Sequence, residues 1–169
     1  MTIAPAIASN LSYDAISTYA ERVGNKHGIY TSDDRADVWS LVEKLDGEVV
    51  VALESESLHV REGGDFTIYI PPTTSERRNR FTIAHELGHY YLHHLLPRAS
   101  NESDLQFSLA RGGRDRAETE ANVFAASLLM PETEFRKFWL RRPDAWRAAA
   151  HFDVSPDAAS LRAQLLAMP

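Results

Sequence analysis

Residues 80–94 read RFTIAHELGHYYLHH, and this stretch contains four of the seven histidines in the 169-residue chain. On an α-helix, residues four positions apart differ by about 40° in direction and by roughly 6 Å in height. His85 and His89 therefore project side by side, so two imidazole nitrogens can bind one metal ion. Glu86 lies at the edge of the same face, within reach of a water molecule at the site. The spacing predicts a metal-binding helix with a carboxylate placed for proton transfer.

The other two histidines of this stretch are interpreted differently. His93 lies near the same face but roughly 12 Å along the helix axis from His85, too far for all three to share one ion. His94 points away from that face. We interpret both as histidines near a helix C-terminus, where the helix dipole favours a positive charge.

A third ligand is needed, because a catalytic zinc usually has three protein ligands. The chain has no cysteine, so any metal must be held by histidines and carboxylates. The segment AETEANVFAASLL, residues 117–129, offers two carboxylates. Glu118 shares its face with small residues that would let two helices approach closely, whereas Glu120 is expected to face outward. We expect Glu118 to be the ligand and Asn122 to hydrogen-bond a liganding histidine. The alternative is that Glu118 is a capping-box partner of Asp115.

The remaining patterns predict an α+β fold in one domain, residues 1–169. A small antiparallel three-stranded sheet is expected from EVVVALE, SLHV and FTIYIPP, and FTIYI could offer an edge to an extended substrate. Helices are expected over residues 13–26, 33–45, 75–96 and 115–130, from residue 131 onward, and as a C-terminal pair within 143–167. The polar stretch 98–113 is a plausible gate over the site.

Charge and hydropathy restrict the class of protein. The net charge of −6 argues against a general nucleic-acid binder, because the chain has no excess of positive charge to attract phosphates. The opening MTIAPAIASN has no basic residue ahead of its apolar run, unlike a secretion signal. The run VFAASLLMP is too short to cross a bilayer. We expect a cytoplasmic protein that binds neither membrane nor nucleic acid directly.

The motif RFTIAHELGHYYLHH, followed after a loop by ExxAN-x-FAA-x-LLMP, resembles the ImmA/IrrE family of metallopeptidases. The resemblance is strong over residues 78–131 and looser over the preceding strands and the tail. It implies a zincin-like, gluzincin-type helical core in which His85, His89 and Glu118 bind zinc and Glu86 is catalytic. It also implies a regulatory protease, whose substrate would be a helix-turn-helix (XRE-like) repressor or a toxin–antitoxin-like partner in stress or mobile-element responses.

This chemistry assigns further roles. Glu86 would take a proton from water and pass it to the leaving amine. The oxyanion needs a hydrogen-bond donor, for which Tyr69, Tyr90 and His151 are candidates, although each is more consistent with a structural role. Zinc is the expected metal, with manganese as a second option.

Two other functions compete with peptide hydrolysis. The segment WRAAAHFDVSPDAASLRAQLL resembles a helix-turn-helix DNA-binding unit. Its recognition helix would begin near Ser155. That helix carries the acidic Asp157 and a single basic residue, Arg162, which disfavours DNA binding. The second competitor is a non-catalytic zincin-fold protein that binds a transcriptional regulator. The intact Glu86 argues against that reading.

Overall fold

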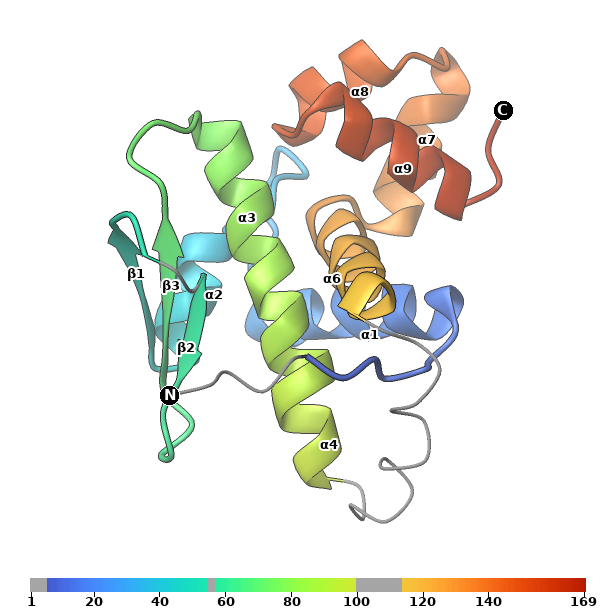
Figure 1. The fold of residues 1–169 in the computed structure, drawn as a ribbon. Helices are drawn as coiled ribbons and strands as arrows, with labels where there is room; N and C mark the ends of the chain where they lie inside the picture. Colours follow the sequence, from blue (N-terminus) through green and yellow to red (C-terminus); the bar gives the residue numbers. More distant parts are fainter. Residues whose placement is uncertain (1–5, 55–56, 100–113) are drawn as a thin grey trace.

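The computed structural model describes residues 6–54, 57–99 and 114–169, and these residues form a helical body with one small sheet at its side (Figure 1). The helix α3, Glu76–His89, runs through the centre, with the sheet on one side and α1 and α6 on the other (Figure 1). The predicted α+β class is confirmed. In chain order the elements are α1 Tyr13–His27, α2 Val38–Lys44, β1 Gly47–Val51, β2 Leu58–Val60, β3 Phe66–Ile70, α3, the π-helix η1 Tyr90–Leu95, α4 Leu96–Ala99, α6 Arg114–Leu129, α7 Glu132–Arg141, α8 Ala145–Phe152 and α9 Pro156–Leu165.

The sheet is mixed, so the prediction of an antiparallel sheet is wrong for one of its pairs. The strand order is β1-β3-β2, with β2 antiparallel to β3 and β1 parallel to it. The tight connection from β2 to β3 pairs them as a hairpin, and β1 takes the other side of β3 in the parallel direction. The apolar composition of a segment predicts that it forms a strand, but not whether it pairs parallel or antiparallel with its neighbour. Because β3 (FTIYI) is paired on both sides, it is the central strand and offers no free edge to a substrate.

The helix α3 begins where the sequence predicts, and the helical path continues through η1 and α4 past the expected end at residue 96. The Ser75 side chain caps it by accepting a hydrogen bond from the Arg78 N–H. Beyond His89 the chain winds as a π-helix before α4, which extends to Ala99. A π-helix has a wider turn than an α-helix and often occurs at functional sites.

The packing of α3 against α6 depends on small residues. A Cβ atom added at Gly88 would lie 3.1 Å from the backbone Cα and O atoms of Ala121. This distance confirms that small side chains let the two helices approach closely. The two helices can therefore bring side chains from both into one site.

The C-terminal helices are fixed to the rest by a buried arginine. Ser155 caps α9 and Pro156 occupies its first turn, as the sequence predicts. Arg162 is fully buried and its Nη2 lies 2.6 Å from Oε1 of Glu21 in α1. Its Nε donates to the carbonyl oxygen of Met130, which follows α6. Within the described residues, the helices are all too short or too polar to cross a membrane.

Candidate metal centre

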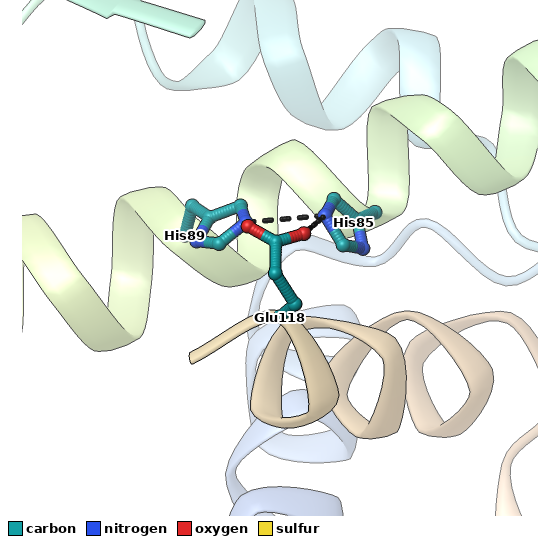
Figure 2. Close-up of side chains that lie close together, drawn as sticks. All are labelled: His85, His89 and Glu118. Atoms are coloured by element: carbon teal, nitrogen blue, oxygen red, sulfur yellow. Dashed lines mark hydrogen bonds and ion pairs between the residues drawn. The ribbon is translucent and has the colours of Figure 1, made fainter. Parts of the chain in front are cut away.

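The side chains of His85, His89 and Glu118 converge between α3 and α6 (Figure 2). The Nε2 atoms of the two histidines lie 3.1 Å apart. Each of them is 3.2 Å from a different carboxylate oxygen of Glu118. The structure thus brings together the three residues that the sequence predicts as ligands. The side chain of Asp115 lies outside the described residues, so the capping-box alternative is not tested.

Asn122 orients the first of these histidines. Its Oδ1 lies 2.8 Å from Nδ1 of His85. An amide oxygen only accepts hydrogen bonds, so Nδ1 carries the proton and Nε2 keeps its lone pair. The predicted contact between Asn122 and a candidate ligand is therefore present, and it aims the lone pair of His85 at Glu118.

The second histidine is oriented by two residues whose roles sequence reasoning missed. His89 Nδ1 lies 2.8 Å from Nδ1 of His93, and His93 Nε2 lies 3.0 Å from Oε2 of Glu120. The side chains of His93 and Glu120 have no exposed area. The expectation that Glu120 faces outward is therefore wrong. The interpretation of His93 as a helix-end histidine is also wrong, because the helical path continues for six more residues, to Ala99.

Long-range packing explains this difference. The backbone N–H groups of Ser9 and Asn10 donate to Glu120 at 2.8 and 3.0 Å, so the N-terminal segment covers this side of α6. Arg116 adds a hydrogen bond from one turn earlier in α6. The pattern of a single helix cannot show that a segment more than 100 positions away covers it. The sequence does carry one signal for the contact between His89 and His93. These two residues repeat the four-residue interval of His85 and His89, which places neighbouring side chains on one helix face.

Burial gives the site its electrostatic character. Loss of hydration, together with the nearby His85 and His93 rings, lowers the pKa of His89 to about 3. His89 is therefore neutral at neutral pH. Two imidazole lone pairs and a carboxylate then point at one another, an arrangement that repels unless a cation lies between them. The two nitrogens and one oxygen are a donor set typical of zinc, so the residues present fit this metal.

Glu86 lies beside this cluster. It is buried, with 5% of its surface exposed, and burial raises its pKa, while a hydrogen bond from Ser57 opposes that rise. Glu86 and His85 both line a pocket of about 650 Å³ that extends along α3. A neighbouring pocket of about 230 Å³ shares Arg78 and Thr82 with it. Glu86 thus borders the same space as a candidate metal ligand.

The three candidate oxyanion donors lie in different places. The Tyr90 hydroxyl donates to the carbonyl oxygen of Gly64 at 2.9 Å. His151 pairs with Asp34 at 3.0 Å and stacks on Phe138. Tyr69 lines the smaller pocket. Tyr90 and His151 therefore have structural partners, and Tyr69 is the candidate that borders open space next to the site.

Two other expectations concern the surroundings of the site. The predicted gate at residues 98–113 lies almost entirely outside the described residues. In the C-terminal helix pair, Arg162 is buried against Glu21 and is not available to a phosphate. This burial removes the basic residue on which a DNA-binding reading of α9 depended.

Comparisons with known proteins show the family of this chain. The family model described as the IrrE N-terminal-like domain, a peptidase family, matches residues 49–164. No curated protein matches the chain. Among solved structures, a Mycobacterium tuberculosis transcriptional regulator is similar, with a TM-score of 0.61 and 20% identity over 89% of this chain. The chain spans 47% of that structure, and at this identity the likeness shows the fold alone. The family match extends over both α3 and α6, and this chain belongs to the IrrE N-terminal-like domain family of peptidases.

Proposed function

We propose that the protein is a zinc-dependent endopeptidase whose metal is held by His85, His89 and Glu118. The convergence of two imidazole lone pairs and a carboxylate at 3.1–3.2 Å carries this proposal. Peptidase family membership supports it. Manganese is a second metal that the same donors could hold. In this proposal the chain forms one peptidase domain, because its ligands come from two helices that share one core.

Glu86 is the general base in this mechanism. A bound zinc ion would polarise the scissile carbonyl and make an attacking water more acidic. Glu86 takes the proton from that water and delivers it to the leaving amine. Its burial supports this role, because a raised pKa brings a carboxylate closer to the value at which it can both accept and donate a proton near neutral pH. The two neighbouring pockets along α3 provide space for a peptide on either side of Thr82.

We propose an intracellular regulatory protein as the substrate, and a helix-turn-helix repressor or a toxin–antitoxin-like partner as its class. The chain is acidic, with a net charge of −6, and DNA-binding repressors carry basic faces. Opposite charges increase the rate at which two proteins meet. The resemblance to peptidases that cut such repressors supports the same class. Cleavage between DNA-binding and dimerising parts of a repressor would release its target genes.

A cleavage assay with matched variants tests this function. The zinc-loaded protein is incubated with candidate regulators, and fragments are identified by mass spectrometry. We expect one discrete cut in a cognate regulator, little activity on casein, and loss of cleavage with a chelator. Glu86→Gln should retain zinc and lower the rate by at least about 10²–10⁴-fold, because an amide does not accept the proton.

Three outcomes would contradict parts of the proposal. Near-normal cleavage by Glu86→Gln would remove Glu86 as the base. Broad digestion of unrelated proteins would mark a general peptidase. Stable binding of a regulator without cleavage would favour the non-catalytic reading.

A further inference from the structure

We infer that Glu120 and His93 are positioning residues that hold His89 with its Nε2 lone pair turned toward the metal site. This inference rests on the proposed metal-binding function. The residues form a continuous chain from Glu120 through His93 to His89, joined by hydrogen bonds of 3.0 and 2.8 Å. Neither residue touches the site itself, so both act through His89.

The carboxylate of Glu120 sets the direction of this chain. Its oxygens accept hydrogen bonds from the N–H groups of Ser9 and Asn10 and from Nε of Arg116. Backbone N–H groups and the Arg116 guanidinium can only donate, and they lie at both carboxylate oxygens, an arrangement that fits an ionised carboxylate. An ionised carboxylate only accepts hydrogen bonds. The Nε2 atom of His93 must therefore carry a proton and donate it to Glu120.

The position of the His93 proton determines the position of the proton on His89. In a neutral imidazole with a proton on Nε2, Nδ1 is an acceptor. The bond between the two Nδ1 atoms must then be donated by His89. A neutral His89 with its proton on Nδ1 has its lone pair on Nε2, the atom 3.2 Å from Glu118. With the opposite polarity, His89 would present an N–H to the site and could not bind a metal.

Burial keeps water from competing for the hydrogen bonds of this chain of residues. The side chains of His93 and Glu120 have no exposed area, so water has no access to replace either partner. The N-terminal residues 9 and 10 supply two of the donors that keep Glu120 in place, although they lie about 110 positions from it in the sequence. The affinity for metal should therefore depend on a segment that does not contact the metal ligands.

The proton positions can be measured directly on the metal-free, full-length protein. Two-bond ¹H–¹⁵N correlation spectra of ¹⁵N-histidine-labelled protein distinguish the two neutral tautomers. We expect the proton of His93 on Nε2 and the proton of His89 on Nδ1. A proton on Nε2 of His89, or a rapidly exchanging mixture of tautomers, would overturn the inference.

Zinc affinity provides a second, independent readout. Glu120→Gln places an amide donor among groups that all donate, and His93→Phe keeps a ring but removes the acceptor for His89. Both variants should bind zinc about 10–100-fold more weakly in competition with a chelating dye. The Co²⁺-loaded variants should also show an altered visible spectrum, which loss of stability alone would not cause.

A buried variant away from the chain serves as the control. Phe135→Leu disturbs the packing of α7, where Phe135 contacts Trp139 and Phe152, and should keep wild-type zinc affinity. Folded Glu120→Gln and His93→Phe proteins with unchanged affinity would overturn the inference. If either variant fails to fold, the tautomers measured in the wild-type protein test the inference instead. Failure of the wild-type protein to bind zinc would instead contradict the proposed function. The tautomers are measured without metal, so that failure would not change their result.

Discussion

Glu86 is held in surroundings that favour its neutral form, because a carboxylate with 5% of its surface exposed loses most of its hydration. Burial raises its pKa, and the neighbouring Glu118 carboxylate acts in the same direction. The charged form of such a buried carboxylate lowers the free energy of unfolding, because it loses hydration when the protein folds. The same residue should therefore support proton transfer and lower the stability of the metal-free protein.

We predict that Glu86→Gln stabilises the metal-free protein at pH 7, by about 1 kcal/mol. The folded-state pKa of Glu86 is raised above its unfolded value, so ionisation destabilises the folded state as the pH rises above that unfolded value. Well below it, Glu86 is neutral in both states and the gain should vanish. Thermal unfolding in chelator, at pH 7 and again at the lowest pH where both proteins fold, measures this difference. A lower melting temperature of the variant at pH 7 would show that Glu86 contributes net stability.

At the scale of elements, the closeness of α3 and α6 brings Glu118 to the two histidines. Gly88 lies at the contact, where an added Cβ would be 3.1 Å from Ala121 Cα, an atom that a side-chain rotation cannot move. We predict that Gly88→Ala lowers the free energy of unfolding by about 1–3 kcal/mol, as overpacking does. Separation of the helices should also weaken metal binding.

Urea unfolding of Gly88→Ala and of Gly63→Ala tests this prediction. Gly63 is exposed, and its added Cβ would meet only the flexible side chain of Asp65, so this control should unfold near the wild-type midpoint. Equal midpoints for the two variants would show that the helix contact tolerates a methyl group.

The local part of the site could be predicted from sequence, and the long-range part could not. The interval between His85 and His89 is a property of one helix, and the small residues around Glu118 indicate a close helix neighbour. The partner of His93 depends on α6, on the π-helix, and on residues 9 and 10 lying over Glu120. The direction of β1 depends likewise on which edge of β3 remains after the β2–β3 hairpin forms. These features arise from packing between segments, and no periodicity within one segment encodes them.

For the whole molecule, Arg162 connects the C-terminal helices to the core that carries the site. Its guanidinium pairs with Glu21 at 2.6 Å and donates to Ser17 and Ser127. Burial lowers the pKa of Arg162, and Glu21 opposes that effect. Removing one partner of a buried ion pair leaves the other without compensation.

We predict that Arg162→Met lowers the free energy of unfolding by about 3–5 kcal/mol. Lys137→Met is the matched control, because the Lys137–Glu134 pair is exposed and such pairs contribute about 0–1 kcal/mol. Chemical denaturation of both variants gives the comparison. A loss of under about 1 kcal/mol for Arg162→Met would mean that the buried arginine does not fix the C-terminal helices.

The central claim is that His85, His89 and Glu118 together hold one metal ion. Anomalous diffraction from crystals of the zinc-loaded protein, recorded on both sides of the zinc absorption edge, tests it most directly. We expect one strong peak per chain within about 2.0–2.2 Å of Nε2 of His85, Nε2 of His89 and an oxygen of Glu118. A peak bound by other residues, or no peak between these three side chains, would contradict the account.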